Sequence, residues 1–576
     1  MKNINVPVGI SNFEKIRQDG YYYVDKTGLI KDMLKNKIPE VTLITRPRRF
    51  GKTLAMSMLA SFFDIRRDSK KLFQGLNISK EQQLCNDWMN QYPTLFLSFK
   101  DVDGTIFENA LGLLQFTIAE LCKKHTYLIE SDGVDQDDKE TFRKLKSMGS
   151  NLPELQGSII MLMNMMKAYY NKPVILLIDE YDVPIAKASS NGYYKEMLEV
   201  MKAMLSTALK DNEALKFAVV TGCLKIAKES VFTGTNNFVS DTISSERYNE
   251  YYGFTQKDVD QILQDAQIEE KASDIKEWYD GYRFGKADVY CPWDVLNYCR
   301  DLLKDEQAQP KNYWLNTSGN DVIEHFIDSV NGQQTLTKIE LERLISGEIV
   351  QKEINEFITY KELYNTSENL WGTLFMTGYL TQRGKADGNR YNLVIPNREV
   401  RNIITEHILV KFRQDIKKDG QMVQRFCQAL ANGQAQQVEQ IFATYMSKTV
   451  SVRDTFVRKA IRENFYHGIL LGILSFKDGW TVTSNRESGN GFSDILIQID
   501  DSDTGIVIEV KYTEEGKSME SDCKAALKQI EEKAYDSMLV EQGISKKQIR
   551  HYGFAFEGKK VLIGSDEKMR KEYKET

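Results

Sequence analysis

The stretch VTLITRPRRFGKT, residues 41–53, decides the fold of the N-terminal part of this chain. Its β-branched, apolar start, Val41–Thr45, predicts a buried strand, and the Arg-rich turn that follows ends in GKT at residues 51–53. A strand that leads through such a loop into a helix is the setting of a phosphate-binding loop, because backbone N–H groups there surround a phosphate. Arg46 stands where the usual first glycine would be, and GKT alone is common by chance.

The residues of this loop are expected to bind the phosphates of a nucleotide. Lys52 would reach the terminal phosphates, and the Thr53 hydroxyl would hold a magnesium ion. Arg48 and Arg49 would add cationic stabilisation, or they would only solvate the turn. The predicted nucleotide-binding residues of the loop are Arg46, Pro47, Arg48, Arg49, Phe50, Gly51, Lys52 and Thr53.

A second stretch, KPVILLIDEYDVPI at residues 172–185, supplies the acidic half of such a site. The continuous apolar run Val174–Ile178 predicts a strand buried on both faces of a parallel sheet. It ends in two acids. We expect Asp179 to be the metal-side carboxylate and Glu180 to be the catalytic base that polarises an attacking water. A merely solvated strand end is the alternative.

Strand and helix patterns alternate over residues 1–245, which predicts a wound α/β domain. A further apolar run ends at Thr221, which would sense the γ-phosphate or would simply begin a turn. The expected strands are Val41–Thr45, Thr94–Phe99, Val174–Ile178 and Phe217–Thr221, and the expected helices include Leu111–Cys122 and Ile159–Tyr170.

Residues 246–405 have a different texture, with aromatic-rich helices that we expect to pack as a lid on the first domain. Within them, Leu370–Ile404 predicts a helix and two short strands, Tyr379–Gln382 and Tyr391–Ile395, arranged as a winged helix. Because this segment is not strongly basic, a lid is favoured over a DNA-binding module. Residues 406–450 read as a helical linker.

The C-terminal residues 451–576 predict a second α/β domain. The expected order is helix, three strands, helix and strand. These elements are Arg453–Leu474, Trp480–Ser484, Phe492–Ile499, Thr504–Lys511, a helix around Lys524–Tyr535, and Tyr552–Phe556.

This order brings a second set of chemical groups together. Glu509 and Lys511 are two apart on one strand, so their side chains share a face, and Asp494 begins the neighbouring strand. Two carboxylates with waters suit Mg²⁺, and the lysine would orient the attacking water or stabilise the pentavalent phosphate. Glu463 would complete the metal set and Gln529 would support the site. A solvent-exposed acidic strand pair with a neutralising lysine is the alternative.

Composition excludes several classes of protein. At 576 residues, with a net charge of -6 and 27% charged residues, the chain is expected to be a soluble protein of several domains. Seven cysteines without a CxxC pair indicate reduced thiols rather than zinc or disulfides. No signal peptide and no membrane span are recognisable, which predicts a cytoplasmic protein without a membrane partner.

Longer strings carry a resemblance to a known family. The chain resembles the predicted AAA-type ATPases that are fused to a C-terminal PD-(D/E)XK nuclease-like domain. The resemblance covers the chain almost end to end and rests on the strings YVDKT (23–27), RPRRFGKT (46–53), LIDEYD (177–182), WYDGYRFG (278–285), YWLNTSGN (313–320), GFSD (491–494) and IEVK (508–511).

The resemblance implies a P-loop NTPase domain of the ASCE/AAA type, a helical and winged-helix lid, and a C-terminal α/β domain like that of restriction endonucleases. It implies ATP and Mg²⁺ at Lys52, Thr53 and Asp179, with Glu180 as base. Asp25 and Lys26 would border the nucleotide base or form a structural clamp at the N-terminus.

The leading hypothesis is therefore an ATPase whose nucleotide state regulates a Mg²⁺-dependent nuclease that acts on DNA. The alternative is a nucleotide-switched scaffold that binds nucleic acid or protein and does not cut. A kinase is disfavoured because no acceptor pocket is identifiable from the sequence. The sequence leaves open the nucleic-acid type and the oligomeric state, with a homo-oligomer as one option.

Overall fold

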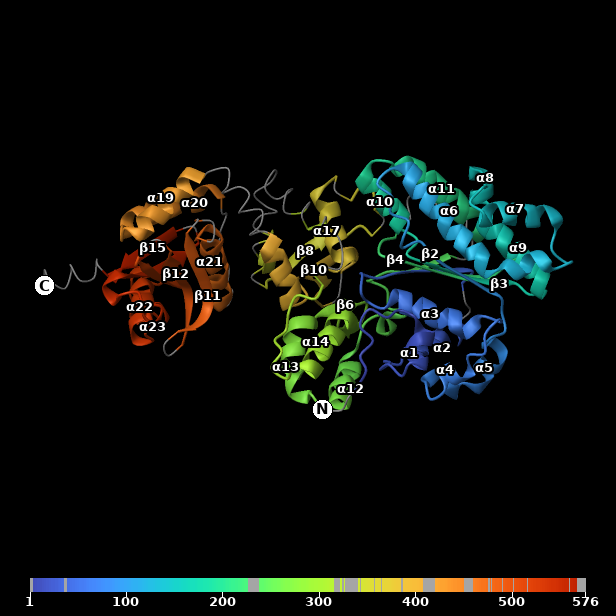
Figure 1. The fold of residues 1–576 in the computed structure, drawn as a ribbon, viewed down its shortest axis with the longest axis horizontal. Helices are drawn as coiled ribbons and strands as arrows, with labels where there is room; N and C mark the ends of the chain where they lie inside the picture. The colour runs from blue at the N-terminus through green and yellow to red at the C-terminus, as the bar shows by residue number, and fades with distance from the viewer. Residues whose placement is uncertain are drawn as a thin grey trace. The chain divides into compact units, whose positions relative to one another are not determined.

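The chain folds into two compact units, one formed by Met1–Val322 with Gln351–Arg401 and the other by Ile323–Val350 with Asn402–Thr576 (Figure 1). The structure is a computed structural model. It describes residues 4–35, 39–225, 238–314, 322–323, 326, 340–341, 343–345, 347–356, 358–363, 365–384, 387–407, 420–449, 459–474, 477, 479–488, 491–500, 502–514, 516–558 and 560–566.

A five-stranded sheet with the order β2-β3-β4-β1-β5 forms the centre of the first unit, and all of its neighbouring strands are parallel. The strands are β1 (Val41–Thr45), β2 (Thr94–Ser98), β3 (Val174–Asp179), β4 (Leu215–Gly222) and β5 (Phe238–Asp241). The four expected strands are confirmed. β5 was not expected, because this edge strand is short and half polar.

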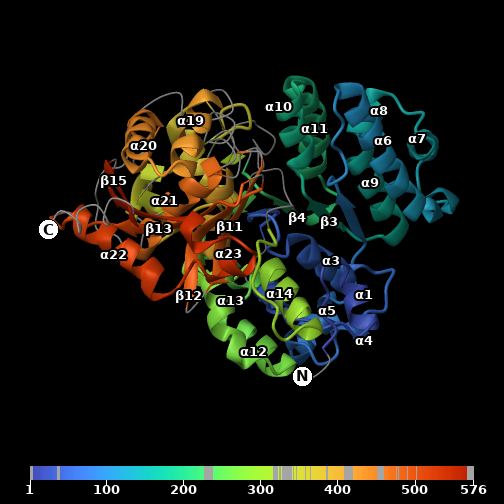
Figure 2. The ribbon, with the colours of Figure 1, turned by 60° about the vertical axis from the view of Figure 1, so that its left-hand side comes forward.

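Helices cover both faces of this sheet, so the domain is the wound α/β type that was predicted (Figures 1 and 2). One face carries α1 (Phe13–Gln18), α2 (Gly28–Lys35), α3 (Lys52–Phe63), α4 (Lys70–Phe73) and α5 (Gln82–Trp88). The other carries α6 (Phe107–Lys124), α7 (Gln136–Lys146), α8 (Leu152–Gln156), α9 (Ser158–Tyr170), α10 (Val183–Asn191) and α11 (Tyr194–Leu209).

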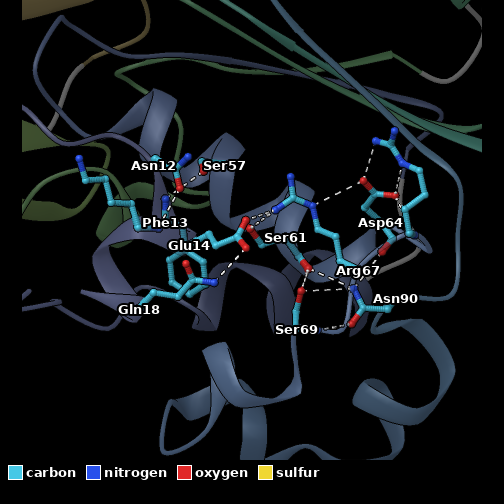
Figure 3. A network of polar contacts seen from close by, with 12 residues as sticks. Asn12, Phe13, Glu14, Gln18, Ser57, Ser61, Asp64, Arg67, Ser69 and Asn90 are labelled. Atoms are coloured by element: carbon cyan, nitrogen blue, oxygen red, sulfur yellow. Dashed lines mark hydrogen bonds and ion pairs between the residues drawn. The ribbon is translucent and has the colours of Figure 1, made fainter. Parts of the chain in front are cut away.

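Helix α3 follows the loop of residues 46–51 directly, and a polar network fixes the middle and the far end of the helix (Figure 3). The backbone N–H of Phe13 donates to the Ser57 hydroxyl (3.0 Å). The side-chain amide of Asn90 donates to the carbonyls of Ser61 (3.2 Å) and Asp64 (2.9 Å). These bonds hold α3 against α1 and the turn beyond it, so the loop before α3 starts from a fixed support.

The rest of the first unit consists of shorter elements that follow the sheet. They are α12 (Gln256–Ala266), α13 (Ala272–Tyr279), β6 (Tyr282–Phe284), β7 (Ala287–Val289), α14 (Pro292–Lys304), β8 (Val350–Glu353), α17 (Ser367–Thr377), β9 (Thr381–Gln382) and β10 (Arg390–Val394). We call residues 351–401 the α17 segment. The expected helix and two strands of this segment are confirmed, and β9 and β10 pair antiparallel. Its identity as a winged helix stays a prediction.

The second unit has a five-stranded mixed sheet with the order β11-β12-β13-β14-β15, in which only β13 and β14 are parallel neighbours. Its elements are α19 (Gly420–Ala431), α20 (Ala435–Thr449), α21 (Lys459–Leu474), β11 (Trp480–Ser488), β12 (Gly491–Ile499), β13 (Gly505–Tyr512), α22 (Met519–Glu532), α23 (Ser537–Glu541), β14 (Ile549–Glu557) and β15 (Lys560–Ser565). The expected elements are confirmed, except that residues 453–458 of the first expected helix lie outside the described residues.

The two faces of this second sheet have separate apolar cores. Helices α19, α20 and α21 pack on one face, where the side chains of Ile495, Ile497, Ile506 and Ile508 point. Helices α22 and α23 pack on the other face with Leu496 and Val507, as the alternation along a strand requires. The helices of residues 406–450, expected to be a linker, thus contribute side chains to the core of the C-terminal sheet. Every helix in the described ranges is too short or too polar to traverse a bilayer.

Candidate functional site

The loop between β1 and α3 closes around its own lysine. The Lys52 ammonium donates to the carbonyls of Arg46 and Pro47, both at 3.0 Å, and its side chain is buried. Gly51 just before it has a φ of 84°, in the left-handed region where a side chain is strained. The loop is therefore preformed, and a cation lies at its centre.

Arg46 has a different task from the one expected. Its guanidinium is fully buried and donates to the carbonyls of Thr45 (2.8 Å), Asp241 (2.9 Å) and Thr242 (2.7 Å). These bonds tie the end of β1 to the end of β5. The side chain thus lies in the interior of the domain, while the backbone N–H of Arg46 donates to the carbonyl of Gly222 (3.2 Å).

Two more side chains of this loop, Arg49 and Phe50, pack against aromatic rings of the same unit. The ring of Phe50 lies 4.9 Å from that of Tyr282, and the Arg49 guanidinium lies 4.0 Å from the ring centre of Trp293. These contacts fasten the loop to β6 and to the start of α14. Of the three loop arginines, Arg48 alone has an exposed side chain.

Three hydroxyls converge on the buried carboxylate of Asp179. Thr53 donates to Oδ2 (2.9 Å), Ser98 donates to the same oxygen (3.3 Å), and Thr221 donates to Oδ1 (2.7 Å). The structure thus brings together Thr53, Asp179 and Thr221 from three elements distant in sequence. Their hard oxygen atoms fit magnesium, which prefers carboxylate, hydroxyl and water ligands. Sequence reasoning missed Ser98, although a polar residue at the end of the neighbouring strand was the available signal.

Glu180 follows Asp179 with a strained backbone. Its φ is 52°, a left-handed conformation that is uncommon for residues other than glycine and that gathers at functional sites. Burial raises the pKa of the Glu180 carboxyl above its ordinary value, and the charge of Lys52 opposes this shift. A carboxylate with a raised pKa is a stronger proton acceptor near neutral pH, as a general base must be.

The N-terminal residues Asp25 and Lys26 make the contacts of a clamp, the second of the two readings left open by the sequence. The Asp25 carboxylate accepts from the Thr27 hydroxyl (2.6 Å) and from the backbone N–H of Asn77 (2.6 Å). The Lys26 ammonium pairs with Asp258 on α12 (2.7 Å). These bonds fasten the N-terminal segment to α12 and leave both side chains engaged.

In the second unit the predicted catalytic side chains gather on one face of the sheet. Lys511 donates to Glu509 Oε1 (2.9 Å), and the Gln529 amide on α22 donates to the same oxygen (2.5 Å). Asp494 on β12 accepts from the backbone N–H of Val510 through Oδ2 (2.8 Å), which brings its carboxyl beside Glu509. The expected convergence of these side chains is thus present.

The electrostatics of this cluster favour a bound cation. Burial first, and then the charge of Asp494, raise the pKa of Glu509 to about 7, while Lys511 opposes the shift. Glu509 Oε2 is buried and has no hydrogen-bond partner among the described residues. A buried, unsatisfied carboxylate oxygen beside a second carboxylate fits a divalent cation, which would satisfy both. Within the described ranges, no three His, Cys, Asp or Glu side chains are grouped as a complete metal cage, so waters would supply the other ligands.

Helix α21 borders the same cluster. Its Glu463 accepts from the backbone N–H of Tyr512 (3.1 Å) at the end of β13. One turn later, His467 Nε2 lies 2.8 Å from the backbone carbonyl of Asp494, and on the other side the Gln529 amide donates to the Tyr535 hydroxyl (3.1 Å). Sequence reasoning missed His467, whose spacing of four from Glu463 on one helix was the available signal.

A cavity of about 120 Å³ adjoins the loop between β1 and α3 in the first unit. It lies between α10 and the α17 segment, and its lining includes Arg48, Lys187, Cys223, Tyr360 and Thr377. Cys223 also connects it to the loop, because the Lys52 ammonium lies 3.7 Å from the Cys223 sulfur. The cavity is thus contiguous with the loop that surrounds Lys52.

Comparison with known proteins separates the same two parts of the chain. Residues 7–232 match the family described as Predicted AAA-ATPase, and residues 461–566 match the PD-(D/E)XK nuclease superfamily. A protein of Azotobacter chroococcum mcd 1, described as an uncharacterized protein in the vnfD 5′ region, is 28% identical over 418 residues, which cover 72% of this chain and 71% of its own length.

Proposed function

Since the chain joins a domain of the predicted AAA-ATPase family to a domain of the PD-(D/E)XK nuclease superfamily, we propose that it is an ATPase that regulates its own nuclease. The N-terminal domain binds and hydrolyses ATP. The C-terminal domain cleaves DNA with Mg²⁺, and the nucleotide state decides when it does so. The observation that carries the proposal is the convergence of Thr53 and Thr221 on Asp179, beside a preformed loop centred on Lys52.

ATP hydrolysis follows from the positions of these side chains. The triphosphate of the substrate lies along the loop, and the Lys52 ammonium neutralises the charge of its terminal phosphates. Thr53 and Asp179 hold magnesium, which when bound offsets charge on the phosphate oxygens. Thr221 lies where a γ-phosphate would end, and Glu180 accepts the proton of the attacking water.

In phosphodiester cleavage each side chain of the C-terminal cluster has its own role. Asp494 and Glu509 would hold the metal ion, which would supply an activated water as nucleophile. Lys511 orients that water and stabilises the negative charge that develops on the phosphate. Glu463, expected from the sequence to be a further metal ligand, instead accepts from the Tyr512 N–H and so supports the end of β13, so waters would complete the coordination. Gln529 fixes the orientation of Glu509.

Two variants test the ATPase half. Lys52→Ala should abolish ATP binding in calorimetry, because the cation at the centre of the loop is lost. Glu180→Gln should still bind ATP but not hydrolyse it. Lys70→Ala, on the exposed start of α4, is the matched control and should behave as the native chain does. Unchanged hydrolysis in Lys52→Ala and Glu180→Gln would refute this half.

A DNA assay tests the nuclease half and separates it from a scaffold that does not cut. Plasmid and linear DNA are incubated with Mg²⁺ or Mn²⁺, with ATP, with ADP and without nucleotide. Cleavage that depends on nucleotide and disappears in Lys511→Ala supports the proposal. Lys528→Ala, an exposed lysine on α22, is the control and should retain cleavage. Intact DNA under every condition would favour the scaffold.

A further inference from the structure

Asp182 lies three residues beyond Asp179, the last residue of β3, and one oxygen of its buried carboxylate accepts three hydrogen bonds. Oδ2 accepts from the backbone N–H groups of Cys223 (2.9 Å) and Leu224 (3.0 Å) and from the Tyr360 hydroxyl (2.8 Å). The side chain is 2% exposed, and Oδ1 has no hydrogen-bond partner among the described residues. A buried carboxylate with this set of donors holds structure together, because any loss of a donor leaves its charge poorly solvated.

One side of this carboxylate is the end of β4. Thr221, which donates to Asp179, is separated by Gly222 alone from Cys223 and Leu224, whose N–H groups donate to Asp182. The Tyr181 hydroxyl donates to the carbonyl of Leu224 (2.8 Å) and so fixes the same loop from its other side. Gly222 passes so close that an added Cβ would lie 2.6 Å from the Tyr181 ring and 2.7 Å from Asp182 Oδ1. The turn after β3 therefore determines where Thr221 lies.

The other side of the carboxylate is the α17 segment. Tyr360, 178 residues away in sequence from Asp182, is buried and packs into the apolar core formed by helices α6 to α11, together with Ile358 and Leu363. Its carbonyl accepts from the Ser189 hydroxyl on α10 (3.3 Å). The segment is thus docked on the ATPase domain at the point where Asp182 holds the end of β4.

We propose that Asp182 is a positioning residue that couples the γ-phosphate end of the nucleotide site to the α17 segment through the Tyr360 hydroxyl. The inference rests on the proposed ATPase function and adds a route for its nucleotide signal. With the hydroxyl bound, Asp182 keeps the Cys223 and Leu224 amides, and with them Thr221, in the position for hydrolysis. When the occupant of the site changes, a shift of this loop pulls on Asp182 and alters the docking of Tyr360.

Tyr360→Phe is the sharpest test, because it removes one oxygen atom and leaves the ring. Hydrolysis should slow about tenfold in kcat with KM within about twofold of native, since a positioning role puts neither residue in contact with ATP. Asp182→Asn should slow hydrolysis as well. The double variant should be no slower than Asp182→Asn alone, because the hydroxyl acts only through that carboxylate.

The readout of coupling is hydrogen exchange in residues 358–377. In the native chain a non-hydrolysable ATP analogue and ADP should protect these amides differently, and Tyr360→Phe should remove the difference while both nucleotides still bind. The control is Tyr193→Phe, which also deletes a buried hydroxyl, one that donates to the carbonyl of Gly104. It should keep native kinetics and the native exchange difference.

The outcomes separate this inference from the function on which it rests. A native chain that does not hydrolyse ATP overturns both. A native chain that hydrolyses ATP, with a Tyr360→Phe variant that keeps native kcat and a native exchange difference, overturns the coupling alone. A lowered melting temperature in Tyr360→Phe with unchanged kcat would show a purely structural role, which also contradicts the proposal.

Discussion

The Lys511 ammonium and the Glu509 carboxylate form an ion pair of 2.9 Å on one face of β13, and both side chains are largely withdrawn from solvent. Burial lowers the pKa of Lys511, but the charge and hydrogen bond of Glu509 and the charges of Glu463 and Asp494 together outweigh it, so the pKa ends above its ordinary value. The lysine is therefore a fixed cation that holds one carboxylate oxygen and leaves the other, Oε2, for a metal ion. The orientation of the Glu509 carboxylate also depends on its second donor, the amide of Gln529.

Gln529→Ala should weaken the use of metal without abolishing it. Removal of the amide frees Glu509 to rotate, and such outer partners of metal ligands contribute about 10–100-fold to metal affinity or activity. We expect cleavage at low Mg²⁺ to fall within that range and to recover partly at high Mg²⁺. Titration of cleavage rate against Mg²⁺ measures the effect. Lys528→Ala on the preceding residue is the control, and an unchanged Mg²⁺ dependence in Gln529→Ala would contradict the assignment.

Thr221→Val should slow ATP hydrolysis and destabilise the first unit. The substitution keeps the shape but removes the donor to the buried carboxylate of Asp179, at a cost of about 1–3 kcal/mol. Urea unfolding and the ATPase rate measure the two effects.

The matched control for that variant is Thr42→Val on the neighbouring strand β1. Thr42 is equally buried, but its hydroxyl has no hydrogen-bond partner among the described residues. Removal of an unpaired buried hydroxyl should be neutral or stabilising. Equal destabilisation of both variants would show that the hydrogen bond between Thr221 and Asp179 does not contribute to the free energy of unfolding.

Arg46→Gly would restore the usual first glycine of the phosphate-loop motif, yet we expect harm. The change leaves three buried carbonyls without their donor and should cost at least about 3 kcal/mol. ATP affinity should not improve, because the side chain lies in the interior. Urea unfolding and calorimetry with ATP check both statements, with Arg383→Gly, at an exposed position, as control. A stable variant that binds ATP more tightly would contradict this view of Arg46.

Local patterns in the sequence were sufficient for the strands and for the residues at their ends. The runs at β1 and β3 are rich in β-branched and apolar residues and are buried along their whole length, so the ends of these strands were predictable, and with them the positions of Lys52, Asp179 and Glu180. Glu509 and Lys511 are two residues apart on a predicted strand, and because side chains alternate between the faces of a strand, both were expected on one face.

Contacts between distant segments were beyond such patterns. The bond from Tyr360 to Asp182 joins residues 178 apart, and nothing near either residue indicates the other. The direction of the Arg46 side chain was also hidden, because it depends on the carbonyls at the end of β5, a strand too short and polar to be recognised. The position of Arg46 in the motif predicted that it binds phosphate. The packing of β1 against β5 instead buries its side chain.

Asp294 on α14 and Glu399 after β10 form a pair of buried carboxyl groups in the first unit, and each residue is 1% exposed. They share a hydrogen bond, and Glu399 also accepts from the backbone N–H of Trp314 (2.8 Å). Burial first, and then the charge of Asp294, raise the pKa of Glu399 far above its ordinary value, and burial also raises the pKa of Asp294. The folded pair therefore keeps a proton at neutral pH.

Glu399→Gln should flatten the pH dependence of stability. Above pH 4.5, the ordinary pKa of a glutamate carboxyl, the unfolded chain releases this proton while the folded chain keeps it. Stability must then fall as pH rises, by up to about 1.4 kcal/mol per pH unit for one proton. An amide has no proton to release, and it can still accept from Trp314 and donate to Asp294. Calorimetric melting between about pH 5 and pH 9 should give the variant the smaller slope and the higher melting temperature at the alkaline end. Glu277→Gln, at an exposed glutamate, should follow the native curve, and parallel curves for Glu399→Gln and the native chain would contradict the shared proton.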